Sequence, residues 1–292
     1  MDIESLRTFL TLADVKSFTK TAELHFVVQS TITNRIAELE KELGRKLFVR
    51  DRKSVILTEE GLHFIGYAKR IIELKDAAQR EIESLKTFCG TLRIGTVNTV
   101  YDCHLYPLIS AFLKKHRDIS VKVITGHSND LIRMLADNTI DVAFTFIPVQ
   151  KSSMNCTPFR TDELIFVTSG RQHTRGIRTI TKEELKDQLI INCDFIIEGG
   201  TLIRDLLPEP CAFPFEIDNG SKLIPYLKDG LGGGFVPRKL VEKELKNGSL
   251  NEIEITDLTL PGIQSYVLTG KKTYQSETIH KWLLELTGQQ TA

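Results

Sequence analysis

One long amphipathic segment most constrains how this chain can fold. Between residues 59 and 88, apolar side chains recur at alternating intervals of four and three residues, with one polar break. The row consists of Phe64, Ala68, Ile71, Lys75, Ala78, Ile82 and Leu85. This spacing predicts a single helix, capped by Thr58-Glu59-Glu60 and roughly 45 Å long. The row would cover either the helix's own domain or a second copy of the helix. Its regularity favours a dimer-forming linker helix over residues 59–89.

The 58 residues before this helix show three helical periods and then two short strands. Apolar spacing and the end signals Ser17 and Gly44 predict helices around residues 3–10, 18–25 and 29–44. Residues 47–49 and 55–57 are apolar and flank a charged turn, which predicts two strands. Two helices joined by a tight turn and followed by a two-stranded wing form a winged helix-turn-helix. The second helix of the pair enters the major groove of DNA, so we expect residues 1–58 to bind DNA.

Polar side chains line the face of that helix opposite its apolar residues Ile32 and Ile36. Amides can form paired hydrogen bonds with adenine, and hydroxyls suit several bases. The candidate DNA contacts on this helix are Gln29, Ser30, Thr33, Asn34 and Arg35. A solvated polar face is the commoner explanation for an isolated helix, but the wing that follows favours DNA.

Positive charge is concentrated in the wing. Residues 45–53 contain five basic side chains and the single acid Asp51, although Lys plus Arg and Asp plus Glu both total 38 over the whole chain. Zero net charge therefore excludes only a uniformly basic protein. Directly after a candidate recognition helix, such a cluster predicts phosphate or minor-groove contacts rather than an ordinary solvated turn. The candidates are Arg50, Arg52 and Lys53.

From residue 90 onward the pattern changes, and strand-like runs alternate with helical ones. The predicted strands cover residues 92–95, 121–124, 141–144, 163–168, 189–191 and 265–268. The helical segments cover residues 105–115, 129–137, 201–207, 224–228 and 279–286. This alternation predicts an α/β fold with a mostly parallel sheet, in which the strand at Glu163 starts a second lobe.

The motifs of the first sixty residues also resemble a known family. They are Leu6-x-x-Phe9, Ser17-Phe18-Thr19-Lys20-Thr21-Ala22-Glu23, Gln29-Ser30-Thr31-Ile32-Thr33, Ile36-x-x-Leu39-Glu40, Leu43-Gly44-x-x-Leu47-Phe48-x-Arg50 and Leu57-Thr58-Glu59-x-Gly61. In this order and spacing they resemble the N-terminal signature of the LysR-type transcriptional regulators. Five positions depart from the family pattern. Thr21, His25 and Val28 stand where Ala, Leu and a capping Ser or Thr are usual, and Thr31 and Thr33 replace the usual small residue and Ser. We expect His25 to be a core histidine with a bonded nitrogen.

The resemblance implies a homodimer or homotetramer that binds a partly palindromic double-stranded DNA operator under the control of a small-molecule effector. It also implies a two-lobed effector domain over residues 90–292, similar to the periplasmic binding proteins. Lobe 1 would comprise about 90–161 and 265–292, and lobe 2 about 162–264.

Four strand-to-helix turns rich in hydroxyls, amides and glycines are candidates for the effector site. Ligands of open α/β sheets bind at such turns, and a helix N-terminus favours an anion, so we expect a carboxylate or similar oxyanion. The candidate residues are Thr96, Asn98, Thr99, His127, Ser128, Gly200, Thr201 and Asn219. For any single turn an ordinary N-cap is the better explanation, but four such turns favour a site among them.

Other chemistries lack their motifs. The chain has no H-x-x-x-H, C-x-x-C, phosphate-loop or G-x-S-x-G pattern, so we expect no metal, no cofactor and no enzymatic activity. Its five scattered cysteines indicate free thiols, with Cys103 and Cys193 structural rather than oxidant-sensing. With no signal peptide or apolar run of membrane length, we expect a cytoplasmic protein without membrane contact. An enzyme with a docking module and a periplasmic solute-binding protein are the alternatives.

Overall fold

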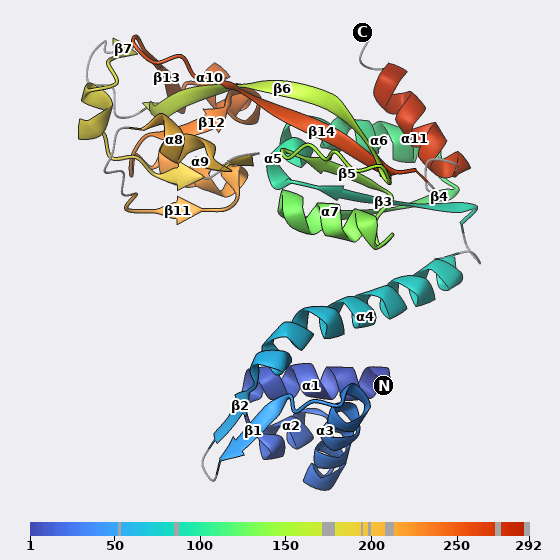
Figure 1. Cartoon of the computed structure of the whole chain (residues 1–292). Helices are drawn as coiled ribbons and strands as arrows, with labels where there is room; N and C mark the ends of the chain where they lie inside the picture. The colour runs from blue at the N-terminus through green and yellow to red at the C-terminus, as the bar shows by residue number, and fades with distance from the viewer. Residues whose placement is uncertain are drawn as a thin grey trace. The chain divides into compact units, whose positions relative to one another are not determined.

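The computed structural model describes residues 1–51, 54–84, 88–170, 179–193, 195–197, 200–207, 213–271 and 276–288. Internal contacts divide the chain into two compact units, Met1–Lys86 and Thr87–Ala292, called unit 1 and unit 2 below. The elements of both can be followed in Figure 1. Among the described residues, no helix combines the length and the apolar character needed to cross a membrane.

Unit 1 is a small helical domain with a β-hairpin. In chain order its elements are α1 (Ile3–Val15), α2 (Phe18–Leu24), α3 (Gln29–Leu43), β1 (Phe48–Asp51), β2 (Ser54–Leu57) and α4 (Glu59–Ser84). Side chains cap the first two helices, because Asp2 accepts a hydrogen bond from the N–H of Ser5 and Ser17 from that of Lys20. Gly44 ends α3 at a φ of 66°, a left-handed conformation that suits glycine. This order of elements confirms the predicted winged helix-turn-helix.

The apolar row on α4 has two different surroundings. Its first half packs within unit 1, where Ala68 is fully buried and Phe64 lies 5.2 Å from Phe9 of α1 between ring centroids. For this half the simpler alternative, packing on the helix's own domain, is correct. Further along the helix Leu74 and Ile82 are exposed, which leaves this end of α4 able to meet another helix. Leu85 lies outside the described residues.

Unit 2 is built on an eight-stranded sheet. Seven strands follow the order β4-β3-β5-β14-β6-β13-β7, and β12 pairs with β6. The strands are β3 (Gly90–Thr96), β4 (Ile119–Thr125), β5 (Val142–Thr145), β6 (Met154–Ser169), β7 (Thr179–Ile180), β12 (Gly234–Pro237), β13 (Leu250–Ile255) and β14 (Gly262–Gly270). Helices and short elements between them are α5 (Asn98–Val100), the π-helical turn η1 (Tyr101–Leu105), α6 (Tyr106–Lys115), α7 (Ser128–Ala136), η3 (Glu184–Asp187), β8 (Asn192–Cys193), β9 (Ile196–Ile197), β10 (Gly200–Thr201), α8 (Leu202–Leu206), β11 (Glu216–Ile217), α9 (Gly220–Lys228), η4 (Arg238–Val241), α10 (Glu242–Lys246) and α11 (Glu277–Gly288).

The sheet is mixed, so the expectation of a mostly parallel sheet is wrong. Strand β3 pairs in parallel with β4 and β5, but β14 runs antiparallel to β5 and β6, and β12 and β13 run antiparallel to β6. The reason in lobe 1 is that β14, which comes late in the chain, lies between β5 and β6 and runs opposite to both. Residues 163–168 do not form a separate strand, because they continue a 16-residue strand that begins at Met154.

Strand β6 connects the two lobes of unit 2. Its first part pairs with β14, whereas Leu164–Val167 pair with β12. In lobe 1, α6 and α11 pack together through Phe112 and the fully buried Trp282, whose rings meet edge to face with centroids 5.3 Å apart. In lobe 2, Phe166 of β6 lies 4.9 Å from Phe235 of β12 between ring centroids. Each lobe therefore has its own aromatic packing, between two helices in lobe 1 and between two strands in lobe 2.

Candidate functional site

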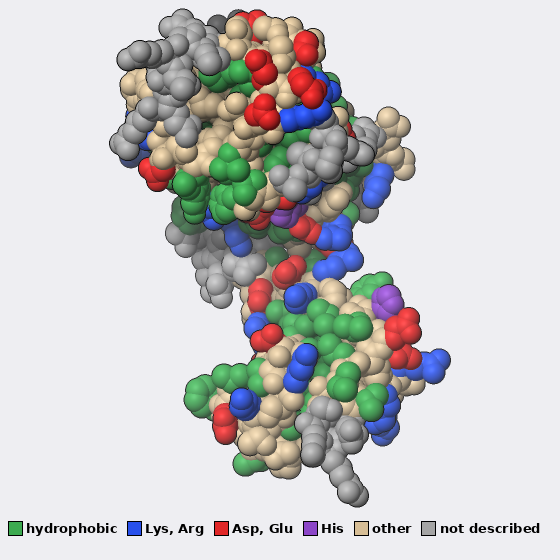
Figure 2. Space-filling view, turned by 90° about the vertical axis from the view of Figure 1, so that its left-hand side faces the viewer, with side chains coloured by type: hydrophobic (Ala, Val, Ile, Leu, Met, Phe, Trp, Pro, Cys, Tyr) green, Lys and Arg blue, Asp and Glu red, His purple; other side chains and the backbone are tan. Residues whose placement is uncertain are grey.

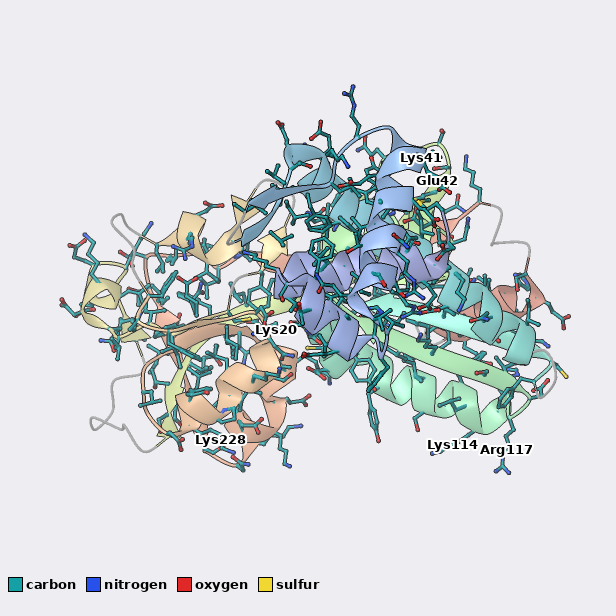
Figure 3. All side chains as sticks on the ribbon, turned by 90° about the horizontal axis from the view of Figure 1, so that it is seen from below. Lys20, Lys41, Glu42, Lys114, Arg117 and Lys228 are labelled. Atoms are coloured by element: carbon teal, nitrogen blue, oxygen red, sulfur yellow. The ribbon has the colours of Figure 1, made fainter. Side chains whose placement is uncertain are left out.

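The exposed face of α3 carries the polar residues expected to contact DNA. Ile32 and Ile36 are buried against α1 and α2, and this fixes the rotation of the helix. Gln29, Ser30 and Asn34 are consequently exposed, whereas Thr33 is half-buried. Figure 3 labels Lys20 on α2 and Lys41 and Glu42 at the far end of α3, so the helix pair can be followed there.

The side chain of Arg35, a candidate DNA contact, instead bonds to residues of α1. Its guanidinium Nη1 donates a hydrogen bond to the hydroxyl of Thr8 over 3.3 Å and lies 3.8 Å from the carboxylate of Glu4, both on α1. These contacts hold its side chain between α3 and α1. The sequence does not reveal this, because the contacts join residues 27 and 31 positions apart.

A buried carboxylate, which the sequence analysis did not single out, holds the base of the wing. Glu40 of α3 accepts hydrogen bonds from the N–H groups of Leu47 and Phe48, over 2.9 and 3.2 Å, and from the ammonium of Lys46 over 2.7 Å. Burial raises the pKa of Glu40, but these three donors outweigh it and the pKa lies below its ordinary value. Lys46 thus has an intramolecular partner. Arg52 and Lys53 lie outside the described residues, and so does the side chain of Arg50.

A pocket in unit 2 is formed by residues that come from both lobes. Its empty volume, open mouth included, is about 420 Å³. The residues that line it are Val97, Asn98, Thr99, Gly126, His127, Ser128, Phe146, Cys193, Phe195 and Asp218. The starts of α5 and α7 contribute most of the polar lining, and Phe146 and Phe195 contact each other edge to face with centroids 6.1 Å apart. The pocket therefore combines an aromatic wall with helix N-termini, which attract anions.

Four of the eight expected effector residues line this pocket, namely Asn98, Thr99, His127 and Ser128. Thr96 does not, since it is fully buried and its hydroxyl donates to the carbonyl of Val97 over 3.0 Å. The side chain of Asn219 caps α9 instead, accepting from the N–H of Ser221 over 3.0 Å. Gly200 and Thr201 form the short strand β10, and their side chains lie outside the described residues.

The polar groups of the pocket differ in how far they are satisfied. Ser128 Oγ accepts a hydrogen bond from the N–H of Phe146 over 3.1 Å, which ties α7 to the end of β5. His127 Nε2 lies 3.8 Å from the carboxylate of Asp218, across the pocket. Thr99 is 6% exposed, and its hydroxyl has no hydrogen-bond partner among the described residues. A hydroxyl that lines the pocket and has no partner within the described part of the protein can donate to and accept from a ligand.

Phe146, Cys193, Phe195 and Asp218 line the pocket but are not among the residues expected to bind the effector. Cys193 was expected only to be a structural thiol. Asp218 directly precedes the predicted turn at Asn219, and this proximity is the only signal that pointed to it. Phe195 lies between two short strands that show no periodic pattern, so only the fold places it in the pocket.

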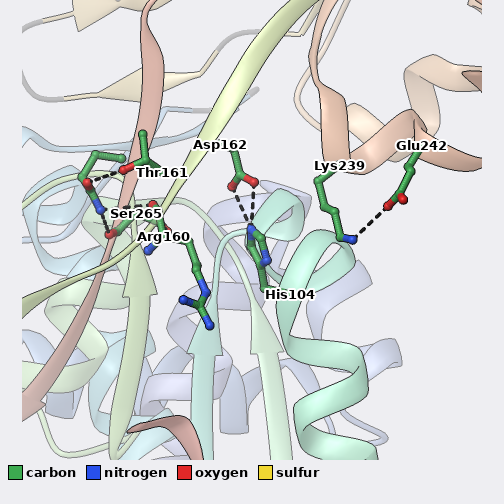
Figure 4. A network of polar contacts seen from close by, with 8 residues as sticks. His104, Arg160, Thr161, Asp162, Lys239, Glu242 and Ser265 are labelled. Atoms are coloured by element: carbon green, nitrogen blue, oxygen red, sulfur yellow. Dashed lines mark hydrogen bonds and ion pairs between the residues drawn. The ribbon is translucent and has the colours of Figure 1, made fainter. Parts of the chain in front are cut away.

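Polar contacts also join the lobes beside the pocket. His104 Nε2 of η1 lies 2.8 and 2.9 Å from the two carboxylate oxygens of Asp162 on β6 (Figure 4). The carboxylate of Asp102 accepts a hydrogen bond from the hydroxyl of Ser221 on α9. Burial, together with the carboxylates of Asp162 and Asp102, raises the pKa of the Cys103 thiol to about 12. Cys103 is therefore a protonated, unreactive thiol at neutral pH.

Known families match both units. Residues 3–62 match the family described as bacterial regulatory helix-turn-helix protein, lysR family, and residues 86–290 match the LysR substrate binding domain. The chain belongs to the LysR family. This LysR-family chain is 25% identical over 289 residues to the HTH-type transcriptional regulator CitR of Bacillus subtilis, covering 97% of each protein. It is therefore a DNA-binding transcriptional regulator with an effector-binding domain, and not an enzyme.

Solved structures of LysR regulators have the same fold. The crystal structure of CbnR, a LysR family transcriptional regulator, superposes with a TM-score of 0.75 at 16% identity, covering 98% of both chains. Full-length CbnR in complex with its target DNA superposes with a TM-score of 0.71 at 17% identity, covering 98% of this chain and 99% of that one. These likenesses confirm the predicted fold class, with a winged helix-turn-helix before a two-lobed α/β domain.

Two of the five departures of this LysR-family regulator from the family pattern have visible structural consequences. His25 is half-buried, and its Nε2 forms a hydrogen bond of 2.9 Å with the hydroxyl of Thr11 on α1, as expected for a core histidine. Val28 precedes α3 and supplies no side-chain hydrogen bond to its first turn. The start of the recognition helix therefore lacks the hydroxyl cap that is usual there.

Proposed function

We propose that this regulator binds its operator through α3 and the wing, and binds a small anionic effector in the pocket between its lobes. The division of labour follows the predicted boundaries. Residues 1–58 bind DNA, 59–89 connect and dimerise, and 90–292 bind the effector, with lobe 1 at about 90–161 and 265–292 and lobe 2 at about 162–264. The observation that carries the proposal is the pocket, which unites helix starts and aromatic side chains from both lobes. Because it acts on DNA, we place the protein in the cytoplasm.

On the DNA side, we assign base contacts to Gln29, Ser30, Thr33 and Asn34. Their support is the exposed or half-buried position of each on the free face of α3, together with the hydrogen-bonding groups that base edges require. Arg50, Arg52 and Lys53 bind phosphates, on the strength of charge and position in the sequence alone. Arg35 positions α3 on α1, because its guanidinium already bonds to Thr8 there.

On the effector side, the anion lies at the starts of α5 and α7, near Asn98, Thr99, His127 and Ser128. None of the described lining residues is a lysine or an arginine. Backbone N–H groups and hydroxyls would therefore supply the attraction, assisted by His127 when it is protonated. Phe146 and Phe195 would cover an apolar part of the same ligand. Thr96 and Asn219 support the walls, since Thr96 is buried and Asn219 caps α9. Gly200 and Thr201 remain effector candidates on the strength of their position in the sequence alone.

The regulator acts as a dimer or tetramer, and the exposed end of α4 supplies a dimer contact. Leu74 and Ile82 remain uncovered there, in a helix whose earlier residues Phe64, Ala68 and Ile71 pack within unit 1. Two winged helix-turn-helix domains would then bind the two half-sites of a partly palindromic operator. The second copy matters because residues 1–60 are neutral overall and their positive charge is concentrated in the wing.

Regulation follows from the preference of the effector for one arrangement of the two lobes. His104 with Asp162, and Asp102 with Ser221, already connect η1 to β6 and α9 beside the pocket. A ligand held between the lobes adds to these contacts in the closed arrangement and shifts the population towards it. The shift alters the spacing of the DNA-binding domains in the oligomer.

The decisive experiment selects genomic fragments bound by the full-length protein, with and without pools of cellular metabolites. We expect a small set of fragments that share a partly palindromic sequence, and a footprint that changes when an anionic metabolite is added. A Thr99→Val variant should keep the fragments and respond to the metabolite only at higher concentrations. Binding to no preferred fragment would contradict the DNA assignment. A metabolite response that Thr99→Val leaves intact would contradict the pocket assignment.

A further inference from the structure

Two apolar side chains stand exposed immediately before the recognition helix. Phe26 is 95% exposed and Val28 is 68% exposed, the two largest exposed fractions among the described large apolar side chains. Apolar side chains reach the surface of unit 1 in several places (Figure 2). These two are unusual because both also occupy backbone positions that apolar residues normally avoid.

Phe26 occupies the left-handed position of the turn that ends α2. The N–H of Phe26 bonds to the carbonyl of Glu23 over 3.1 Å, and the N–H of Val27 bonds to that of Ala22 over 3.0 Å. These two bonds form a Schellman turn, whose central residue must adopt positive φ. Phe26 has a φ of 54°. Glycine or asparagine fills such a position without strain, so phenylalanine here costs folding free energy.

Val28 is the N-cap of α3, with an extended backbone at φ −76° and ψ 151°. Serine, threonine, aspartate and asparagine are favoured at this position because their oxygens accept from the first turn of the helix. Val28 cannot do this, and no side-chain cap is formed. Phe26 and Val28 are therefore both less stabilising than the residues usual at their positions. Both present apolar surface close to Gln29, the first residue of α3.

We propose that Val28 and Phe26 form an apolar edge of the recognition helix that contacts the C5-methyl groups of thymines in the operator. This inference rests on the proposed DNA interface and deepens it. The apolar edge is continuous with that interface, because Val28 directly precedes Gln29 and Ser30, which are exposed amide and hydroxyl side chains. In the major groove only thymine presents a methyl group, and apolar side chains recognise it by contact.

The chemistry of the surroundings favours DNA over another occupant. The edge consists of two side chains flanked by polar residues, which is too small for a stable protein interface by itself. A helix inserted into a major groove would bring both side chains close to base edges and sugars, where their exposed surface would be buried. The apolar edge thus favours thymine over the other bases at the positions that it contacts. Gln29 and Asn34 form hydrogen bonds to the neighbouring bases.

The test replaces single thymines of the selected operator by uracil, which removes only the methyl group. For the unmodified protein, we expect affinity to fall about threefold to fivefold at one or two positions per half-site, as the loss of one buried methyl predicts. For Val28→Ser and Phe26→Asn, thymine and uracil operators should bind within about twofold of each other at those positions. Both variants should unfold at the same or a higher temperature, because serine caps α3 and asparagine tolerates positive φ.

The control variant is Leu43→Ser, which alters an exposed apolar side chain at the opposite end of the same helix. It should keep the full response to uracil. If the unmodified protein binds its operator but ignores every thymine-to-uracil replacement, the inference is overturned while the proposed function stands. If Val28→Ser and Phe26→Asn keep the uracil response, another residue contacts the methyl group and the inference is again overturned. If no operator is bound at all, the proposed function and this inference fail together.

Discussion

The candidate sites of the two units are built in opposite ways. In unit 1 the residues assigned to base contacts come from one helix, within six positions of the sequence, and they point into solvent. In unit 2 the pocket gathers residues from position 97 to position 218, and several of them are buried. A site on one helix face needs only that the opposite face be packed. A site between two lobes needs the whole sheet to form before its parts meet.

This difference extends to the buried acids near each site. In unit 1, Glu40 is satisfied by two backbone N–H groups and one lysine, all within eight residues of it. In unit 2, the carboxylate of Asp141 accepts hydrogen bonds from the backbone N–H and the guanidinium of Arg93, over 2.7 to 3.1 Å. Arg93 lies 48 residues earlier in the chain. The partners of Glu40 therefore lie close to it in the sequence. Asp141 meets its partner only when β3 and β5 pair within lobe 1.

The largest expected effect tests whether the units fold independently. Phe9 is fully buried and touches the rings of Phe48 and Phe64. Phe9→Ala should lower the stability of unit 1 by about 3–5 kcal/mol, because it opens a cavity in a small core. Denaturant unfolding followed by hydrogen exchange should show unit 1 opening early while unit 2 keeps its protection and its effector affinity. Phe26→Ala, which removes an exposed phenylalanine, is the matched control and should leave both units protected. An equal loss of protection in unit 2 after Phe9→Ala would show that the two are one cooperative body.

The next effect concerns the helix face itself. Asn34→Ala should weaken binding to the selected operator by about 1–3 kcal/mol and relax specificity at one base pair, because an amide can hydrogen-bond a base edge at two points. Lys41→Ala, at the far end of the same helix, should leave the base preference unchanged. Titration against operators with every single substitution measures both. An equal loss of affinity on random DNA would show that Asn34 contacts the backbone of DNA instead.

A smaller effect should depend on pH and remain within unit 1. The lowered pKa of Glu40 means that the folded state holds its proton less tightly than the unfolded chain does. Its contribution to stability is therefore present above the unfolded pKa and is lost as the pH falls through the folded pKa. Glu40→Gln should cost about 1–2 kcal/mol at pH 7, since the charged hydrogen bonds are weakened. Urea unfolding at pH 7 and at pH 3 should show this cost shrinking in acid, whereas Glu38→Gln, on the exposed side of α3, should be neutral at both. A cost that is unchanged at pH 3 would mean that the shape of the side chain, and not its charge, supports the wing.

The smallest effect distinguishes a residue that binds the effector from one that only supports the fold of unit 2. Thr99→Val removes a hydroxyl without a partner among the described residues, so stability should hold while effector affinity falls by about 0.5–1.5 kcal/mol. Thr96→Val is the matched opposite, because its hydroxyl bonds to the Val97 carbonyl and lies outside the pocket lining. It should lower stability by about 1 kcal/mol and spare the effector. Calorimetric titration and thermal unfolding of both variants distinguish the two roles. If Thr96→Val lowered effector affinity and Thr99→Val did not, the effector would bind at Thr96 and not in this pocket.

The sequence alone determined the features that depend on residues close together in the chain. Helical spacing placed α1, α2 and α3, the caps Ser17 and Gly44 set their ends, and the packed residues Ile32 and Ile36 determined which side of α3 is exposed. These features depend on neighbours within a few positions, so periodicity and residue type suffice to find them. The family resemblance rested on the same sixty residues for this reason.

The tertiary structure decided what depends on distant partners. Only the fold shows that Phe64 of the α4 row packs against Phe9 and that Arg35 bonds to Thr8 of α1. Only the fold shows that β6 is one strand that runs through both lobes. Only the fold brings Phe195 and Asp218 to Asn98 and Thr99. Contacts across a hundred residues leave no periodic trace in a sequence, because each partner is chosen by the sheet that positions it and not by its neighbours along the chain.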